Sequence, residues 1–223
     1  MFRLILFDID GTLITTGGAG MKAFSGAFAE IFGLPEATEN ISFAGRTDHG
    51  LVSEIFGANG IEPTANNFNK FEQAYFERLA QFLPQDAREP LPGVRRVIAE
   101  FRELNPPPLI GLLTGNHPRG AEIKLGHYGL WEEFAMGAFG DQDVDRNEVA
   151  RTALEQGRSL IPGLRPAEIL VIGDTDRDIQ CARTIGAKVL AVATGPLSVA
   201  ELQAHEPDWV MADLTSFQPA TLI

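Results

Sequence analysis

The chain has 223 residues, with 30 acidic against 18 basic side chains and a formal net charge of −12. This balance argues against a nucleic-acid or anionic-membrane partner, because no basic stripe is present that could neutralise phosphates. It is compatible with a small phosphorylated metabolite, which needs a few local cations or a metal ion. Hydrophobic residues make up 44% of the chain, enough to build the core of one large domain or two smaller ones.

One cysteine, Cys181, excludes an intrachain disulfide and fits a reducing compartment. We interpret it as a small apolar residue of a packed helix. The apolar start of the chain is too short for a signal peptide, and no apolar segment is long enough to span a bilayer. We therefore expect a cytoplasmic protein without a membrane partner, and the sequence leaves monomer or homodimer open.

The first residues predict a buried strand followed by two carboxylates. Residues 4–7 are an apolar run without alternation, typical of a strand buried on both faces in a parallel sheet. Asp8 and Asp10 follow at the carboxyl end, where ligands bind in open α/β sheets. Because buried carboxylates placed together need a neutralising cation, a hard ion such as Mg²⁺ is the simplest partner. A polar turn at Asp10-Gly11 is the alternative.

The next stretch predicts helices and no strand. Residues 13–20 are rich in glycine and small side chains, which indicates a loop that can also serve as a hinge. Three amphipathic helices are expected where apolar residues recur at intervals of three and four: residues 21–32, 49–56 and 67–82.

The remainder alternates strands with helices. The expected strands are short apolar runs, at residues 109–113, 134–139, 168–172, 188–192 and 209–211. The expected helices lie between them, at residues 94–104, 119–128 and 147–157, then up to residue 185, and at 198–204. This alternation predicts an α/β fold with a parallel sheet covered on both sides. We expect a core of residues 1–14 and 89–223, with residues 15–88 inserted as a separate helical domain.

Polar side chains follow three of the predicted strands. Since the carboxyl ends of parallel strands share one edge of a sheet, these clusters are expected to converge. Their members are Asp8, Asp10 and Thr12, then Thr114, Gly115 and Asn116, and finally Asp174 and Asp178.

At these clusters the chain resembles the haloacid dehalogenase superfamily of phosphohydrolases. D-I-D-G-T at residues 8–12 resembles its first motif and L-L-T-G-N at residues 112–116 its second. G-D-T-D-R-D at residues 173–178, followed by Ala182 and Gly186, resembles its metal-binding fourth motif. The resemblance covers nearly the whole chain. It implies a Rossmann-like three-layer core with a parallel sheet and, in residues 15–88, a small helical cap that closes over the site.

The resemblance implies a role for each carboxylate. Asp8 is the expected nucleophile, which forms an aspartyl-phosphate, and Asp10 is the expected general acid and base. The carboxylates of Asp8 and Asp174 and the backbone carbonyl of Asp10 are expected to hold Mg²⁺. Asp178 is expected either to bind the ion directly or to orient the groups that do.

Other residues are expected to bind the substrate. Thr114 and the backbone amides of Gly115 and Asn116 would bind phosphoryl oxygens close to a helix start, which favours anions. Thr12 belongs to the same expected set. Arg46, in G-R-T-D, resembles a cap segment that contacts substrate in related enzymes, and an exposed arginine at a helix start is the alternative.

The third motif departs from the family pattern. The family has a lysine before the helix that precedes the fourth motif, and here Arg146, in D-R-N-E, lies at the matching place. Its guanidinium can supply the positive charge for the phosphoryl group. The alternative is a surface arginine paired with a neighbouring acidic residue. Lys124 is the second candidate, although its place inside a predicted helix argues against it.

The sequence thus favours a Mg²⁺-dependent phosphatase acting on a small phosphomonoester, similar to phosphoglycolate phosphatases. A phosphomutase uses the same core, and a non-catalytic protein that binds a phosphorylated ligand also stays open because the usual lysine is missing. Haloacid dehalogenation is disfavoured, because that branch lacks the second aspartate and needs no metal. The sequence does not identify the phosphomonoester.

Overall fold

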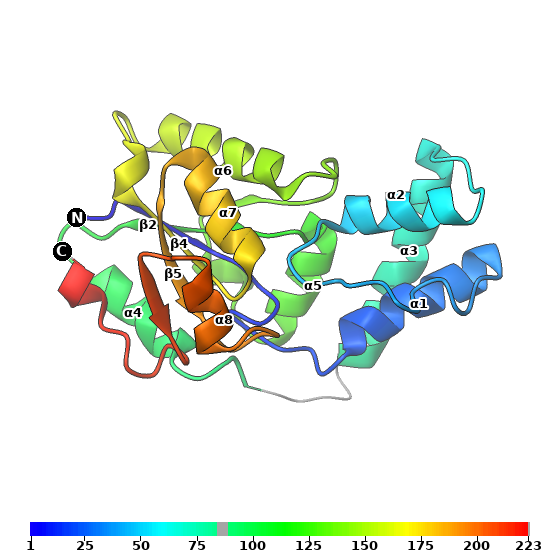
Figure 1. The fold of residues 1–223 in the computed structure, drawn as a ribbon, viewed down its shortest axis with the longest axis horizontal. Coiled ribbons are helices and arrows are strands. Elements are labelled where there is room, and N and C mark those ends of the chain that lie inside the picture. Colours follow the sequence, from blue (N-terminus) through cyan, green and yellow to red (C-terminus); the bar gives the residue numbers. More distant parts are fainter. Residues whose placement is uncertain (84–88, 223) are drawn as a thin grey trace.

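A parallel sheet of six strands lies at the centre of the computed structural model, which describes residues 1–83 and 89–222. The strand order is β3-β2-β1-β4-β5-β6, with helices on both faces (Figure 1). The strands are β1 (Leu4–Phe7), β2 (Leu109–Leu113), β3 (Met136–Ala138), β4 (Ile169–Gly173), β5 (Lys188–Val192) and β6 (Trp209–Met211). The predicted α/β class with a parallel sheet is confirmed.

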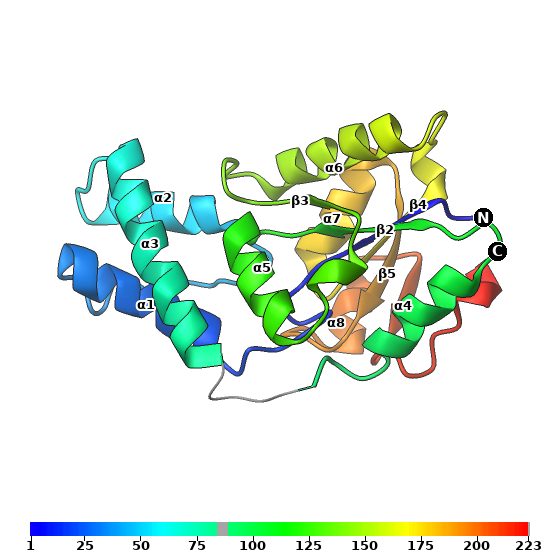
Figure 2. The ribbon, with the colours of Figure 1, turned by 180° about the vertical axis from the view of Figure 1, so that it is seen from behind.

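Two layers of helices cover the sheet, and a third group lies beyond its carboxyl edge (Figures 1 and 2). The helices of the two layers are α4 (Val94–Glu103), α5 (Pro118–His127), α6 (Arg146–Leu160), α7 (Asp176–Ile185) and α8 (Val199–Ala204). The third group is α1 (Ala19–Phe32), α2 (Asp48–Ala58) and α3 (Ala65–Phe82). Short 3₁₀ turns at Trp131–Glu133, Pro166–Glu168 and Pro219–Leu222 were not predicted.

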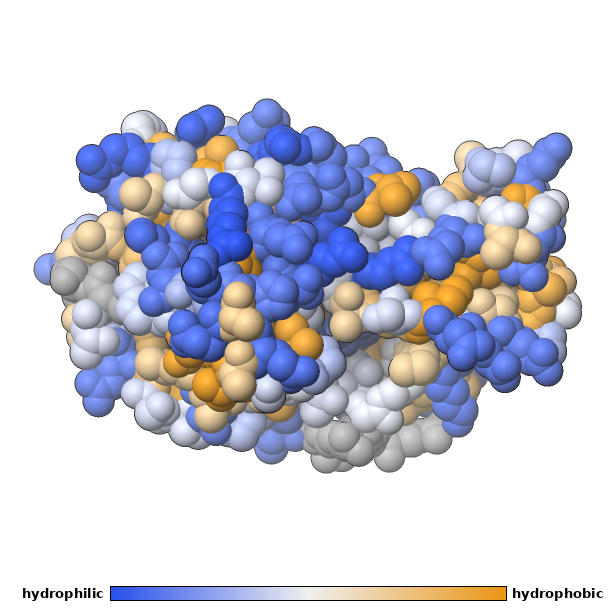
Figure 3. Space-filling model, viewed as in Figure 1, coloured by the Kyte–Doolittle hydropathy of each residue, from blue (hydrophilic) through white to orange (hydrophobic). Residues whose placement is uncertain are grey.

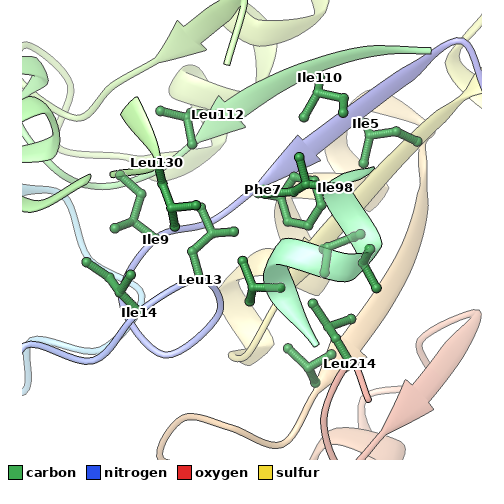
Figure 4. Packing of buried hydrophobic residues seen from close by; sticks show 14 of the residues in the cluster. Ile5, Phe7, Ile9, Leu13, Ile14, Ile98, Ile110, Leu112, Leu130 and Leu214 are labelled. Atoms are coloured by element: carbon green, nitrogen blue, oxygen red, sulfur yellow. The ribbon is translucent and has the colours of Figure 1, made fainter. Parts of the chain in front are cut away.

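The central strand β1 is buried on both faces, as its unbroken apolar run predicts. Successive side chains of a strand point to opposite faces. Ile5 and Phe7 therefore join the apolar cluster under α4 and α5, where Phe7 lies beside Ile98 (Figure 4). Leu4 and Leu6 join the cluster under α6 and α7. This double burial fixes the end of β1, and with it the position of the residues that follow.

Helices α1–α3 have an apolar cluster of their own. Phe24 and Phe28 of α1 pack against Phe71 of α3, with ring centroids 4.6 and 4.7 Å from it. Aromatic rings in this arrangement bury much apolar surface in a small unit. The division of the chain into a core and a helical domain stays a prediction, and its expected boundary at residue 88 lies outside the described residues.

The predicted elements are all found, and the bounds of most of them differ by one to three residues. One difference bears on the site: Arg146 is the first residue of α6, where the sequence suggested a position just before the helix. The helix starts there because the Asp145 side chain accepts a hydrogen bond from the Asn147 backbone N–H at 2.9 Å, which caps the helix.

The outer surface in the view of Figure 3 is mostly hydrophilic over the α/β layers, in keeping with the acidic composition. Within residues 1–83 and 89–222, no helix combines the length and the apolar composition that crossing a membrane requires.

Candidate active site

The three polar clusters meet at the carboxyl edge of the sheet. The strand order β3-β2-β1-β4-β5-β6 reverses beside β1, since β2 and β3 are added on one side of it and β4 to β6 on the other. Such switch points form ligand crevices in open α/β sheets. A cavity of about 320 Å³ opens there between the sheet edge and α1–α3. The predicted site residues that line it are Asp8, Asp10, Arg46, Thr114, Gly115, Asn116, Arg146 and Asp174.

Arg146 lines this cavity and joins two buried carboxylates, Asp8 and Asp178. Its Nη2 donates to Asp8 Oδ1 at 2.7 Å and to Asp178 Oδ1 at 2.6 Å. The arginine is only 5% exposed, so it is not the surface residue that the sequence left as the alternative. Burial disfavours the charged guanidinium, but Asp178 and Asp8 outweigh it and raise the pKa of Arg146. The residue is therefore a permanent cation beside Asp8.

Asp174 faces Asp8 from the end of β4. Thr12 Oγ1 donates to Asp174 Oδ1 at 2.9 Å, which orients the carboxylate. The turn that brings Thr12 to Asp174 depends on Gly11, whose φ is +87° and whose position leaves no room for a side chain. A Cβ at Gly11 would lie 2.3 Å from Asp174 Oδ2. Thr12 itself is buried behind Asp174 and does not line the cavity.

The donor chemistry of this group fits a divalent metal ion. Carboxylate oxygens of Asp8, Asp174 and Asp178 all lie within 4.8 Å of one another. When ionised, the three carboxylates face one guanidinium, which leaves two negative charges in excess. Without a further cation, burial raises the pKa of Asp8 to about 7 and that of Asp174 well above its usual value. A divalent ion removes this cost, and oxygen ligands are what a hard ion such as Mg²⁺ or Ca²⁺ takes.

Asp178 differs from the other two carboxylates because its oxygens already have partners. Oδ1 accepts from Arg146, and Oδ2 accepts from the Thr175 backbone N–H at 3.0 Å and its hydroxyl at 2.6 Å. Asp178 does not line the cavity. Of the two roles left open by the sequence, this geometry favours the one in which Asp178 orients Arg146 and the β4 loop.

Asp10 is held from the opposite side of the cavity. Its Oδ2 accepts hydrogen bonds from Asn116 Nδ2 at 2.8 Å and from Lys124 Nζ at 2.7 Å. The Asn116 Nδ2 group also contacts Thr114 Oγ1 at 2.9 Å. Lys124 lies inside α5, as predicted, and its place in that helix brings its ammonium to Asp10 and not to Asp8.

Residues 45–49, which we term the closing segment, bring the helical part of the chain onto the second motif. The Asp48 backbone N–H donates to the Gly115 carbonyl at 2.7 Å, and the Asp48 carboxylate accepts from the His117 backbone N–H at 2.8 Å. Burial raises the pKa of Asp48 to about 6. The approach is so close that a Cβ at Gly115 would lie 1.9 Å from the Arg46 carbonyl oxygen.

The helical part also supplies lining residues that sequence reasoning did not assign to the site. Met21, Phe24, Phe43, Leu51 and Tyr75 give one side of the cavity an apolar surface. The amphipathic pattern of residues 21–32 predicts a buried face, and Phe24 on that face is 2% exposed, but the pattern does not reveal which buried residues border a cavity.

Arg46 is half-buried at the mouth of the cavity and pairs with Glu54 of α2. Its contact with a substrate stays a prediction, as do the roles of the other site residues.

Comparison with known proteins places the chain in a family. The description "Haloacid dehalogenase-like hydrolase" belongs to a family model that matches residues 5–192. The chain belongs to this family. The resemblance inferred from the three motifs is thereby confirmed.

Two curated relatives are phosphatases by name. The chain is 28% identical to a phosphoglycolate phosphatase of Synechococcus elongatus, over 94% of this chain and 92% of that protein. It is 27% identical to an N-acetylmuramic acid 6-phosphate phosphatase of Pseudomonas putida, over 86% of this chain and 83% of that protein. These relatives support the predicted enzyme class, a phosphoric monoester hydrolase.

The fold has close counterparts among solved structures. The crystal structure of CbbY from Rhodobacter sphaeroides in complex with phosphate superimposes with a TM-score of 0.73, at 19% identity. The match covers 97% of this chain and 96% of that one. This likeness confirms the fold.

Substitution of Gly115 tests the contact with the closing segment. Gly115→Ala places a methyl group where the Arg46 carbonyl lies, so we expect residues 45–49 to be displaced and the free energy of unfolding to fall by about 1–3 kcal/mol. Denaturant unfolding measures the change. Gly126→Ala in α5 is the matched control, because a Cβ there meets no atom within 4 Å. Equal stability of the Gly115 and Gly126 variants would contradict the prediction.

Metal binding can be tested without any substrate. At 100 times its dissociation constant, a divalent ion that binds only the folded state adds about 2.7 kcal/mol of stability, a shift of several degrees in melting temperature. We expect this shift in the parent protein and its loss in Asp174→Asn. Asp176→Asn, two residues further on, should keep the shift, because Asp176 is not part of the carboxylate group. The measurement is thermal unfolding with and without Mg²⁺, and a shift retained in Asp174→Asn would disprove the site.

Proposed function

We propose that the protein is a Mg²⁺-dependent phosphatase that hydrolyses a small phosphomonoester through an aspartyl-phosphate on Asp8. One observation carries the proposal: Asp8 lines the cavity, and one oxygen of its carboxylate accepts a hydrogen bond from the buried Arg146. Asp10, the candidate proton donor, lines the same cavity. A nucleophile, a cation and an acid thus face one space.

In the first step, an oxygen of the Asp8 carboxylate attacks phosphorus and the bond from phosphorus to the leaving oxygen breaks. Phosphoryl transfer depends mainly on alignment and on neutralising the phosphoryl oxygens. Arg146 supports this step, because its position beside Asp8 Oδ1 brings a fixed positive charge next to the group transferred. Thr114 and the backbone amides of Gly115 and Asn116 are the proposed partners of the remaining oxygens.

The proton for the leaving alkoxide comes from the carboxyl group of Asp10. In the second step Asp10, now a carboxylate, takes a proton from a water molecule as that water attacks the aspartyl-phosphate. Inorganic phosphate leaves, and the Asp8 carboxylate is restored. Splitting one difficult displacement into two in this way is the advantage of covalent catalysis.

The carboxylates of Asp8 and Asp174, with the backbone carbonyl of Asp10, are the proposed ligands of Mg²⁺. When bound, the ion would neutralise phosphoryl oxygens and the excess of carboxylate charge. Asp178 holds Arg146 in place, and both of its oxygens accept hydrogen bonds from the chain, which favours an orienting role over a direct bond to the ion.

The cavity supports a small leaving group. Its volume of about 320 Å³ is at the lower end for ligand sites, and the phosphoryl group takes part of it. The apolar side chains of α1–α3 and of the segment before α2 would face the organic part of the substrate. We propose that these helices act as a cap that excludes water, with Arg46 reading the leaving group.

The test is phosphate release from a panel of phosphomonoesters, with Mg²⁺ and with a chelator. 2-Phosphoglycolate, N-acetylmuramic acid 6-phosphate, glycerol phosphate and p-nitrophenyl phosphate sample leaving groups of different size and charge. We expect metal-dependent release from at least one ester, and its loss in a folded Asp8→Asn variant.

Other outcomes would contradict the proposal. Transfer of the phosphoryl group to a second sugar phosphate, without release, would identify a phosphomutase. Tight binding of phosphomonoesters with no turnover would identify a binding protein.

Substitution of Arg146 tests whether its positive charge beside Asp8 is what the reaction requires. One nitrogen, Nη2, makes the contacts to both Asp8 and Asp178, while Nε is buried without a partner. A lysine ammonium can make both contacts from one atom, so we expect Arg146→Lys to keep kcat within about ten-fold. Arg146→Met should lower kcat by about 100-fold or more, because it removes the charge beside the nucleophile. Equal activity of the two variants, in steady-state kinetics, would disprove this role.

A further inference from the structure

Lys124 is a buried cation that the proposed reaction does not yet use. It lies in the middle of α5, and its side chain is 6% exposed. Burying an ammonium is costly unless it is paired. In this structure its Nζ donates to Asp10 Oδ2 and to Asn116 Oδ1, both at 2.7 Å.

These contacts form a closed triangle. Asn116 accepts from Lys124 through its carbonyl oxygen and donates to Asp10 Oδ2 through its amide nitrogen at 2.8 Å. The donors of Lys124 and Asn116 therefore converge on one oxygen of Asp10. Each of the three side chains limits the rotation of the other two, which is how a fixed geometry is built from flexible side chains.

The other oxygen of Asp10 is left for the reaction. Among residues 1–83 and 89–222, no side chain or backbone group donates a hydrogen bond to Asp10 Oδ1. The Asp10 side chain is 40% exposed and lines the cavity. One oxygen is thus fixed by two donors while the carboxyl group stays accessible to a ligand.

The surroundings of Lys124 keep its ammonium in this place. Gly20, at the start of α1, lies over it: a Cβ there would be 3.6 Å from both Nζ and Cε of Lys124. The charge faces Asp10, while the phosphate-facing cation beside Asp8 is Arg146. The two buried cations of the site therefore pair with different carboxylates of the cavity lining.

We infer that Lys124 is a positioning residue, which together with Asn116 fixes the Asp10 carboxyl group for proton transfer and does not bind the phosphoryl group. The inference rests on the proposed function, in which Asp10 is the acid and base. General acid and base catalysis contributes about 10²–10⁴-fold to a rate, and it depends on the position of the group. By fixing the position of Asp10, Lys124 would supply a part of this rate enhancement.

The first measurement is the steady-state kinetics of Lys124→Met with an alkyl phosphate. Methionine keeps most of the length of the side chain, lacks only the position of Nζ, and removes its donors. We expect kcat to fall by about 10–100-fold while KM changes by less than three-fold, because alignment of Asp10 matters in the reacting complex. Lys124→Arg, which keeps a donor, should recover part of kcat. Lys70→Met, on the exposed face of α3, is the matched control and should behave as the parent protein.

The second measurement removes Asp10. The substrate is p-nitrophenyl phosphate, whose leaving group needs no proton. In an Asp10→Asn background, we expect Lys124→Met to change the rate of the p-nitrophenol burst by less than three-fold. Residues that act through one another have non-additive effects, whereas independent residues have additive ones.

Several results would overturn the inference. A large rise in KM with unchanged kcat would make Lys124 a substrate-binding residue. If Lys124→Met lowered the rate in the Asp10→Asn background by as large a factor as in the parent protein, Lys124 would act independently of Asp10. Failure of both Lys124 variants to fold, judged by circular dichroism, would assign it a structural role. If the parent protein releases no phosphate from any ester, the proposed function fails, which is a separate outcome.

Discussion

The structure depends on keeping several carboxylates close together in a place with little water. Asp8, Asp174 and Asp178 are each at most 5% exposed at the carboxyl edge of the sheet. Ionised groups in such surroundings repel one another and lose their hydration, which the raised pKa of Asp8, about 7, reflects. This arrangement is stable only with cations, and the chain supplies one in Arg146. The remaining charge is what a divalent ion would balance.

The paired strands of the sheet position these groups. The strand β1 is buried on both faces and lies between β2 and β4, so the turn at Asp8 is supported from both sides. The close approach at Gly11 brings Asp174 against this turn, and the close approach at Gly115 brings the closing segment against the second motif after β2. Three of the carboxylates that line the cavity each have a defined partner: Asp8 pairs with Arg146, Asp10 with Lys124, and Asp174 with Thr12. Such pre-organisation suits a reaction in which charge must be stabilised at fixed positions.

Much of this was predictable from the sequence because the signals are local. An unbroken apolar run followed by D-I-D-G-T specifies a buried strand and its polar end, and the alternation of elements specifies the parallel sheet. The convergence of Asp8, Thr114 and Asp174 followed from the geometry of parallel strands alone.

What could not be predicted depends on contacts between distant segments. The position of Lys124 in a helix was correctly inferred, but helical periodicity does not tell which group lies opposite the side chain. For Arg146, acidic neighbours in sequence offered local partners, and the actual partners are 138 and 32 residues away. Asp48 gave no signal, because a carboxylate at a helix start is common and its hydrogen bond from the His117 backbone N–H joins segments 69 residues apart.

The central claim is that Asp8 becomes phosphorylated, and rapid acid quenching of the enzyme during turnover tests it directly. With a radiolabelled phosphomonoester, the account predicts a covalent phosphoryl group on the peptide that contains Asp8. Its bond should be cleaved by hydroxylamine, as an acyl-phosphate is, and the label should be absent from Asp8→Asn. Active enzyme without covalent phosphate, or with the label on a different residue, would contradict the account.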